Sequence, residues 1–267
     1  MQIIVINMPC AIKRKERISN ILNSMHLEYE ILEAVDGIVD AEKYRKRFSN
    51  ESTMLLSDGE FGCMLSHIKA WEIVASCETS KPYLILEDDV HFASNFKSFL
   101  QEIKIFEDEI GIYRLETMLA RVEISRKIYQ DVKKKYHFHQ LYSNHAGAAA
   151  YILSNRMAKF LLQEIPKLTR AIDTELFDPN RRTISHFPVY QCIPSPCIQV
   201  MLLKDKSLSE GLASQIFDRE DSRLVPIKKT GKFVELIKTL LRPFYLFGVS
   251  QILRRKGRAR VFVPFDS

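Results

Sequence analysis

Short apolar runs alternate with helically spaced apolar residues near the start of the chain. Residues 2–8 are mostly β-branched or otherwise apolar, which predicts a short buried strand. Over residues 13–25 apolar side chains recur at helical spacing, and residues 29–35 indicate a second strand before an Asp-Gly turn signal. A strand, a helix and a strand in this order predict a parallel β-α-β unit.

The rest of the chain continues this mixture. Residues 62–75 place apolar side chains at helical spacing, and residues 83–86 are a continuous apolar run typical of a central strand. The charged stretch 40–58 indicates a variable loop with some helix. The pattern predicts an α/β fold with a mixed, mostly parallel central sheet. Further expected elements are strands at 112–116, 148–153 and 188–193, a hairpin at 121–142 and a helix at 155–165.

Length and composition are those of an ordinary globular protein. The 267 residues suffice for one large domain or two small ones, and 46% hydrophobic with 27% charged residues exclude disordered and fibrous classes. Five cysteines without a C-x-x-C pair argue against a disulfide framework and a structural zinc site, and they indicate a reducing compartment. We expect neither a signal peptide nor a membrane span, because no uncharged run approaches about 20 residues.

Positive charge is concentrated in the last forty residues. Residues 228–267 hold ten Lys or Arg and two acidic residues, a net charge of +8, which leaves −2 for residues 1–227. Between Phe233 and Phe244 apolar residues recur at helical spacing beside basic ones. We therefore expect a globular domain at 1–227 and a basic amphipathic helical tail at 228–267 that binds an anionic membrane surface. A helix packed on the domain is the alternative, and no nucleic-acid partner is expected because no aromatic platform accompanies the charge.

Three successive carboxylates, Glu87, Asp88 and Asp89, directly follow the predicted strand at 83–86. Ligands in α/β sheets collect at the carboxyl ends of strands, and buried carboxylates are costly without a positive partner. On an extended chain Glu87 and Asp89 would face one side and Asp88 the other, which gives a two-carboxylate clamp for Mn²⁺ or Mg²⁺. An acidic surface loop is the alternative.

Basic and imidazole side chains accompany this cluster. Arg14 and Arg17 follow the first predicted strand, where guanidinium groups and a helix N-terminus suit a nucleotide diphosphate. His67 lies on the predicted helix at 62–75. Taken alone, each arginine is more typical of a solvated helix residue than of a ligand contact, and the histidine is more typical of a structural hydrogen bond.

Seven segments, in order along nearly the whole chain, resemble one enzyme family. The chain is similar to glycosyltransferase family 25, the lipopolysaccharide and lipooligosaccharide group that also contains the procollagen galactosyltransferases. The segments that carry the resemblance are residues 59–67 (GEFGCMLSH) with Trp71, 86–90 (LEDDV), 114–118 (RLETM), 145–154 (HAGAAAYILS), 172–173 (ID), 194–199 (PSPCIQ) and 261–265 (VFVPF).

The resemblance implies a GT-A nucleotide-binding fold and an inverting transfer that forms a β-linkage. The hexose, galactose rather than glucose, would move from a UDP-sugar donor to a hydroxyl of an outer-core sugar. The metal ligands of Mn²⁺ or Mg²⁺ would be Asp89 and Asp88. The residues implied to contact the nucleotide are Asn7, Arg14, Arg17, Asp36, His67, Glu87 and Asp88.

Inverting transfer needs a carboxylate that deprotonates the acceptor hydroxyl on the face opposite the leaving group. We expect Asp173 in this role, at the start of a short helix, with Glu116 after a strand as the second candidate. Helix N-capping is the alternative role for Asp173. A metal-dependent nucleotide-sugar phosphohydrolase and a non-catalytic membrane-associated module stay open as other functions of the chain.

The acceptor implied by the family is a lipid-anchored oligosaccharide. Membrane binding by the basic tail would confine the search for this acceptor to two dimensions. We therefore expect a cytoplasmic protein that is peripheral on the cytoplasmic face of the bacterial inner membrane.

Overall fold

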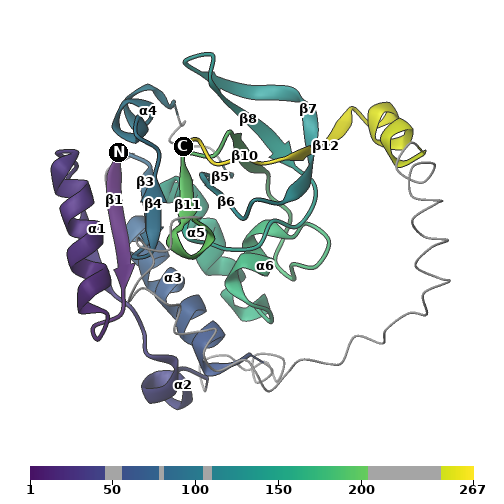
Figure 1. Cartoon of the computed structure of the whole chain (residues 1–267). Helices are drawn as coiled ribbons and strands as arrows, with labels where there is room; N and C mark the ends of the chain where they lie inside the picture. The colour runs from purple at the N-terminus through teal and green to yellow at the C-terminus, as the bar shows by residue number, and fades with distance from the viewer. Residues whose placement is uncertain (46–55, 78–80, 105–109, 204–247) are drawn as a thin grey trace, which may run out of the picture.

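A nine-stranded sheet forms the centre of the computed structural model, which describes residues 1–45, 56–77, 81–104, 110–203 and 248–267 (Figure 1). Its strands lie side by side in the order β12-β7-β8-β10-β5-β9-β3-β1-β2. Their bounds are β1 Gln2–Asn7, β2 Glu30–Glu33, β3 Tyr83–Glu87, β5 Ile112–Arg114, β7 Arg121–Val132, β8 Tyr136–Leu141, β9 Ala150–Leu153, β10 Val189–Ile193 and β12 Arg258–Phe262.

Helices cover both faces of this sheet (Figure 1). Along β3, Leu84 and Leu86 pack in one apolar cluster with side chains of α1 and α4, whereas Tyr83 and Ile85 pack in the other with α3 and α5. Burial on both faces explains why this strand is continuously apolar. The helices are α1 Ile12–Ser24, α2 Gly37–Arg45, α3 Asp58–Ser76, α4 Phe96–Glu102, α5 Asn155–Glu164 and α6 Ile172–Phe177, with 3-10 turns at Ile165–Lys167 and Val200–Leu202.

The N-terminal strands confirm the predicted β-α-β unit. β1 pairs in parallel with β2 on one side and with β3 on the other, and Ile4 lies opposite both Glu30 and Ile85. The helix α3 between β2 and β3 begins with a capping box, in which the Ser57 hydroxyl accepts from the Glu60 N–H and the Glu60 carboxylate accepts from the Ser57 N–H. This helix supplies one wall of the site described below.

The prediction of a mostly parallel sheet is wrong. Within the described residues of the nine-stranded sheet, three strand pairings are parallel and five are antiparallel. The cause is β9, which runs antiparallel between β3 and β5, together with the β7–β8 hairpin and β12 at one edge. The hairpin itself was predicted correctly. Single-strand apolar patterns do not reveal strand direction, so this feature could not be read from the chain.

A small second sheet extends from the acidic cluster. Its order is β4 (Val90–Phe92), β11 (Cys197–Gln199) and β6 (Glu116–Thr117), with β11 antiparallel to β4 and parallel to β6. The Val200 N–H also donates to the Asp89 carbonyl oxygen at 2.9 Å. The backbone that carries the carboxylates is therefore tied to a segment more than a hundred residues later in the chain.

The end of the predicted tail belongs to the sheet rather than to a separate helix. Strand β12 pairs antiparallel with β7, Val263 is fully buried, and the Thr117 hydroxyl donates to its carbonyl oxygen at 2.6 Å. Residues 248–255 are helical, whereas the predicted amphipathic stretch between Phe233 and Phe244 lies outside the described residues. No helix in the described part of the chain is long and apolar enough to cross a membrane.

Candidate active site

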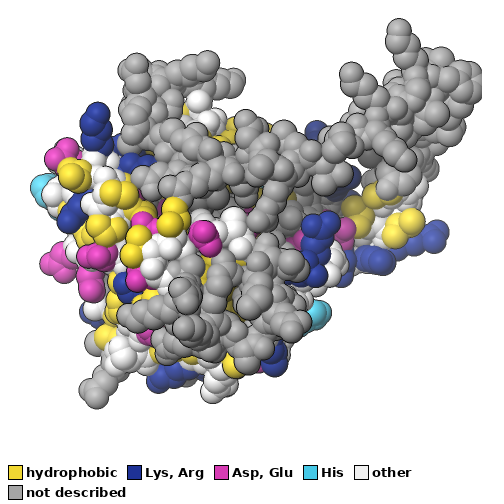
Figure 2. Space-filling view, turned by 90° about the horizontal axis from the view of Figure 1, so that it is seen from below, with side chains coloured by type: hydrophobic (Ala, Val, Ile, Leu, Met, Phe, Trp, Pro, Cys, Tyr) yellow, Lys and Arg dark blue, Asp and Glu magenta, His cyan; other side chains and the backbone are white. Residues whose placement is uncertain are grey.

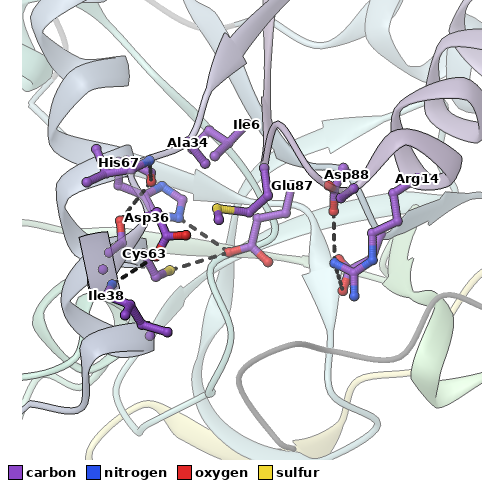
Figure 3. Close-up of a pocket in the computed structure, with 17 residues that line it drawn as sticks. Ile6, Arg14, Ala34, Asp36, Ile38, Cys63, His67, Glu87 and Asp88 are labelled. Atoms are coloured by element: carbon purple, nitrogen blue, oxygen red, sulfur yellow. Dashed lines mark hydrogen bonds and ion pairs between the residues drawn. The ribbon is translucent and has the colours of Figure 1, made fainter. Parts of the chain in front are cut away.

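A pocket opens where β1 and β3 end, between α1 and α3 (Figure 3). Ligands of α/β proteins bind at such strand ends, and polar groups from four successive segments of the chain converge here. The side chains that carry charge or a reactive group among those lining the pocket are Arg14, Asp36, Cys63, His67, Glu87, Asp88 and Asp89.

Asp88 is held by side chains from the first β-α connection. Its Oδ2 accepts from Asn7 Nδ2 at 2.7 Å, and its Oδ1 accepts from Arg14 at 3.0 Å. Asn7 is the last residue of β1 and is itself buried. The first strand therefore fixes the orientation of Asp88 directly, and the arginine compensates its charge.

Asp89 differs from Asp88 because one of its oxygens has no partner. Its Oδ2 lies 4.0 Å from the Arg14 guanidinium, whereas its Oδ1 is buried and makes no hydrogen bond within the described residues. Burial raises the pKa of Asp89, Glu87 raises it further, and Arg14 opposes both effects. A buried carboxylate oxygen without a donor is the atom that a bound cation would satisfy.

The assumption of an extended acidic cluster is wrong. Strand β3 ends at Glu87, and the chain turns at the next two residues. Asp88 and Asp89 consequently both lie near Arg14, whereas Glu87 points to the other side of the pocket, toward α3 (Figure 3). The expected clamp of Glu87 with Asp89 was based on side chains that alternate along an extended strand, and the strand ends at Glu87.

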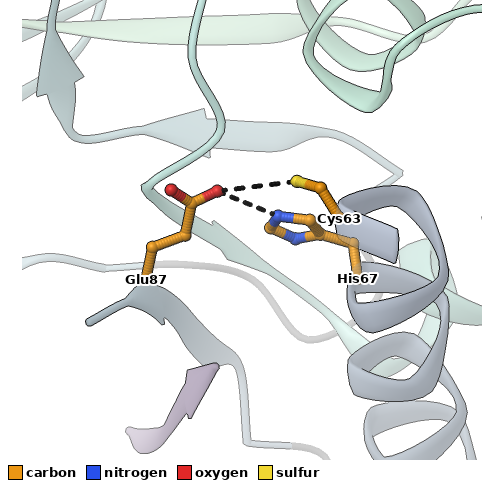
Figure 4. A group of neighbouring side chains, drawn as sticks. All are labelled: Cys63, His67 and Glu87. Atoms are coloured by element: carbon orange, nitrogen blue, oxygen red, sulfur yellow. Dashed lines mark hydrogen bonds and ion pairs between the residues drawn. The ribbon is translucent and has the colours of Figure 1, made fainter. Parts of the chain in front are cut away.

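Glu87 contacts two residues on one face of α3 (Figure 4). Its Oε1 lies 3.4 Å from His67 Nε2 and 3.9 Å from Cys63 Sγ. Burial raises the pKa of Glu87, and the nearby Asp88 and Asp173 raise it further. Burial also lowers the pKa of His67 to about 4, so this imidazole is neutral at pH 7.

A chain of hydrogen bonds behind His67 orients its ring. Trp71 Nε1 donates to the Tyr151 hydroxyl at 2.9 Å, and that hydroxyl lies 2.9 Å from His67 Nδ1. The indole N–H can only donate, so the hydroxyl accepts from Trp71, and the other ring nitrogen, Nε2, faces Glu87. Tyr151 lies in a segment that carries the family resemblance, but its contact with α3 was not predicted, because the two residues that it meets lie eighty or more residues earlier in the chain.

Arg17 and Asp36 have structural contacts of their own. Arg17 donates to the Val90 carbonyl oxygen at 2.9 Å, which ties α1 to the strand after the acidic cluster. The Asp36 carboxylate accepts from the Ile38 and Val39 N–H groups at 2.9 and 3.4 Å, at the start of α2. Asp36 lines the pocket, whereas Arg17 does not.

The two candidate bases, Glu116 and Asp173, lie on either side of Gly147. The Gly147 N–H donates to Asp173 Oδ2 at 3.0 Å, and a Cβ added at Gly147 would lie 3.0 Å from Glu116 Oε2. Neither carboxylate lines the pocket, but Asp173 raises the pKa of Glu87 through its charge. Asp173 does not cap α6, since the cap position is Ala171.

Glu116 is fully buried beside a buried arginine. Its Oε1 accepts from the Ala149 N–H at 2.7 Å and lies 3.3 Å from Arg114, whereas its Oε2 has no hydrogen bond within the described residues. Burial raises the pKa of Glu116 to about 8 despite the arginine. Arg114 also donates to the carbonyl oxygens of His145 and Ala146, so it fixes the loop that leads to Gly147.

This assembly can be compared with known proteins. The profile of "Glycosyltransferase family 25 (LPS biosynthesis protein)" matches residues 1–176, which include the whole acidic cluster and Asp173. The chain belongs to glycosyltransferase family 25. The resemblance expected from the sequence motifs is thereby confirmed.

Curated relatives agree with this family. The lacto-N-neotetraose biosynthesis glycosyltransferase LgtE of Neisseria gonorrhoeae is 28% identical over 244 residues, which cover 84% of this chain and 83% of the relative. The lipooligosaccharide biosynthesis protein lic2B of Haemophilus influenzae is 27% identical over 270 residues, 97% of this chain and 95% of the relative. A procollagen galactosyltransferase 2 of Mus musculus is 34% identical over 116 residues, 40% of this chain and 18% of that protein.

Among solved structures, an inositol-1-phosphate CTP transferase from T. maritima aligns with 79% of this chain and 94% of its own. The sequence identity is 10% and the TM-score is 0.35, which is too low to bear on the fold.

Proposed function

We propose that this glycosyltransferase transfers a hexose, galactose rather than glucose, from a UDP-sugar to a hydroxyl of an outer-core sugar of lipooligosaccharide or lipopolysaccharide. The transfer is inverting, forms a β-linkage and takes place on a GT-A-like scaffold. Asp89 carries this proposal, because among the described residues its buried Oδ1 lacks a partner just after β3, beside the Arg14–Asp88 pair. Relatives named for lipooligosaccharide and lacto-N-neotetraose biosynthesis support the acceptor class.

The carboxylates suit a hard divalent cation. Asp89 supplies a buried anionic oxygen, and oxygen ligands are those that Mn²⁺ and Mg²⁺ take in proteins. Asp88 is the second ligand in this proposal, although both its oxygens already accept hydrogen bonds from Asn7 and Arg14. When bound, the ion neutralises charge on the diphosphate leaving group.

Four further residues bind the donor or hold the acidic cluster in this proposal. Arg14 lies at the pocket beside Asp88 and presents its guanidinium to the place where a diphosphate would gain charge. Asp36 directly precedes α2 and lines the pocket, and in this proposal it contacts the ribose or the uracil. Asn7 and Arg17 act behind the pocket wall, by fixing Asp88 and the Val90 backbone.

Asp173 is the base in this proposal. A general base must be unprotonated, and the pKa of about 8 keeps Glu116 largely neutral at pH 7. The Gly147 and Thr174 N–H groups donate to the two oxygens of Asp173 at 3.0 and 2.6 Å and fix the direction of its carboxylate. Glu116 then serves to hold the Ala149 backbone and balance the charge of Arg114.

A lipid-anchored acceptor places the enzyme at the cytoplasmic face of the bacterial inner membrane, where basic residues at 228–257 bind anionic lipid. Exposed Arg254 and Arg255 end the helical residues 248–255 and exposed Lys256 follows them, and Figure 2 shows Lys and Arg side chains gathered at that end of the molecule. Basic side chains near apolar ones favour an anionic lipid surface.

Release of UDP by the purified chain tests this function. With Mn²⁺, release from UDP-galactose is expected to exceed that from UDP-glucose and to depend on a lactose- or glucose-terminated acceptor. EDTA and Asp89→Asn should each lower it about 100-fold or more. Asp131→Asn removes a half-exposed carboxylate on β7 and should leave it unchanged. Release that is indifferent to acceptor would instead favour a phosphohydrolase, and absence of both release and UDP binding would favour a non-catalytic module.

A further inference from the structure

Three side chains of different chemistry meet on the α3 side of the pocket. Within the described residues, Cys63, His67 and Glu87 each offer one ligand atom, and these atoms all lie within 4.8 Å of one another (Figure 4). Cys63 and His67 are four residues apart and therefore project from the same face of α3. Glu87 comes from the end of β3 and points at both of them.

Two of the three separations are close to those of a tetrahedral metal site, and all three ligand atoms lie within 4.8 Å of one another. Zinc bonds of about 2.0–2.3 Å at tetrahedral angles place any two ligand atoms roughly 3.3–3.6 Å apart. Glu87 Oε1 already lies 3.4 Å from His67 Nε2 and 3.9 Å from Cys63 Sγ. A shift of Cys63 Sγ by a few tenths of an ångström would therefore bring both separations into this range.

An outer layer of hydrogen bonds supports the imidazole. The Tyr151 hydroxyl lies 2.9 Å from His67 Nδ1 and also accepts from Trp71 Nε1. With a metal on Nε2 the ring proton lies on Nδ1, which then donates to the same hydroxyl oxygen. Outer partners of this kind orient a metal-binding histidine and commonly change metal affinity 10- to 100-fold.

We propose that Cys63, His67 and Glu87 bind a thiophilic divalent cation of the zinc class, at a site distinct from the hard-cation site at Asp89. One thiolate, one imidazole and one carboxylate form a ligand set that suits zinc rather than manganese or magnesium. On binding, the thiol proton of Cys63 leaves to solvent and the sulfur becomes a thiolate ligand. All three ligands line the pocket, so the fourth position is open to it.

Occupation of this site affects the nucleotide pocket, an inference that rests on the proposed function. The metal draws Glu87 toward α3, and its own fourth ligand occupies space where the UDP-sugar would enter. Zinc and the donor nucleotide therefore compete. The site acts as an inhibitory metal site of the transferase rather than as part of its chemistry.

Cobalt spectroscopy tests the metal site without any activity. The reduced, full-length, metal-free protein is titrated with Co²⁺, and a thiolate-to-cobalt charge-transfer band with visible bands of four-coordinate cobalt is expected. Zn²⁺ should displace the cobalt and remove both. Cys63→Ser should abolish the charge-transfer band, His67→Gln should weaken binding, and Tyr151→Phe should weaken it about 10-fold.

Two controls identify the ligand thiol. Cys10→Ser, which changes a surface thiol, and Asp89→Asn should both keep the band. Far-UV circular dichroism checks that each variant is folded, and Cys63→Ala serves as a second test of the thiol. Absence of the band in the wild-type protein, its survival in folded Cys63→Ser or Cys63→Ala, or its loss in Cys10→Ser would each overturn the proposal.

Calorimetry with UDP separates this proposal from the proposed function. In the presence of Mn²⁺, added Zn²⁺ should weaken UDP binding to the wild-type protein but not to Cys63→Ser. Equal weakening in both proteins would refute the competition. If UDP fails to bind at all, the transferase proposal fails, whereas the cobalt spectrum still decides whether the metal site exists.

Discussion

Gly147 shows how a single residue can hold two carboxylates in place. Its φ is +88°, a conformation that side chains rarely adopt, and its backbone lies against Glu116 while its N–H donates to Asp173. No other residue type fits both the backbone angle and the close approach. The close spacing of Asp173 and Glu116 therefore depends on a glycine, which has no side chain, at position 147.

Gly147→Ala is expected to lower the free energy of unfolding by about 1–3 kcal/mol and to reduce kcat. The added methyl group is strained at positive φ and lies 3.0 Å from Glu116 Oε2. Urea denaturation and steady-state kinetics measure the two effects. The matched control is Gly257→Ala, where φ is +67° but no atom of the described residues lies within 4 Å of the added Cβ, so it should cost less and leave kcat unchanged. Equal costs at both positions would contradict the role of the Glu116 contact.

Glu116 makes stability depend on pH in an unusual direction. Its pKa is about 8 in the folded protein and 4.5 as a free side chain, so between these values the folded state binds the extra proton. The free energy of unfolding therefore falls as pH rises from about 4.5 to 8. Glu116→Gln cannot ionise and should lack this decline. Its free energy of unfolding should therefore rise by a few kcal/mol relative to that of the wild-type protein as the pH approaches 8.

Denaturation curves at a series of pH values check this expectation. Glu102→Gln, which changes a half-exposed carboxylate at the end of α4, serves as the control and should follow the wild-type pH dependence. A constant difference between Glu116→Gln and the wild-type protein at all pH values would show that Glu116 is ionised in the folded state at neutral pH.

At the scale of elements, helix α3 begins with a capping box, packs in the hydrophobic core and carries Cys63 and His67 of the pocket. Trp71 packs fully buried and donates to Tyr151 on β9, while one turn earlier His67 faces the pocket. The position of this helix along its axis consequently determines where Cys63 and His67 meet Glu87. Its N-terminal capping box is the local signal that fixes where it begins.

Ser57→Ala should lower the free energy of unfolding by about 1 kcal/mol, because the Glu60 N–H loses its acceptor. The loss also loosens the first turn of α3, where Gly59 lines the pocket, so UDP binding should weaken modestly. Thermal unfolding and calorimetry measure both. Ser76→Ala removes a hydroxyl at the other end of the same helix and should change neither by a comparable amount. Larger effects at Ser76 than at Ser57 would refute the importance of the cap.

The sequence predicted the elements better than their arrangement. The runs at 2–8 and 83–86 predicted buried strands correctly because both faces of β1 and β3 are covered, which leaves a local signature. The direction of β9 and the short strands β4 and β11 have no such signature, since they depend on pairing between residues far apart in the chain. Tertiary contact rather than local preference decides these features.

The site shows the same division. The acidic cluster was recognisable because three carboxylates after an apolar strand are rare, and the family motifs supplied Asp173. The contact of Glu87 with Cys63 and His67 could not be recognised from the sequence. Cysteine spacing alone argued against a metal site, and Glu87 lies twenty residues beyond His67. Side-chain direction at the turn after β3 could only be learned from the fold.

At the scale of the whole molecule, the C-terminal residues have two separate roles in our proposal. Residues 258–266 complete the sheet, where the Ser195 N–H donates to the Pro264 carbonyl oxygen at 2.8 Å and the Tyr136 hydroxyl donates to Asp266. Deletion of residues 228–267 would therefore damage the body as well as any membrane contact. A test of membrane binding has to change charges and leave β12 in place.

Replacement of Lys228, Lys229, Lys232, Lys238 and Arg242 by Gln should abolish binding to vesicles that contain anionic lipid. Each basic side chain near such a surface contributes about 1 kcal/mol, so five of them account for a change of more than about a thousandfold in partitioning. Turnover of a soluble acceptor should be unchanged, because the pocket and the sheet keep all their residues. Vesicle sedimentation and the UDP-release assay measure the two properties on the same protein.

The control removes the same amount of charge elsewhere, with Gln at five exposed lysines on the body: Lys13, Lys81, Lys127, Lys134 and Lys159. It should still bind the vesicles, because these lysines are spread over several elements and do not form one basic surface. If both variants lose binding equally, net charge alone attracts the protein to the membrane. If neither does, residues 228–242 are not the membrane contact, and the acceptor has to be found by the pocket itself.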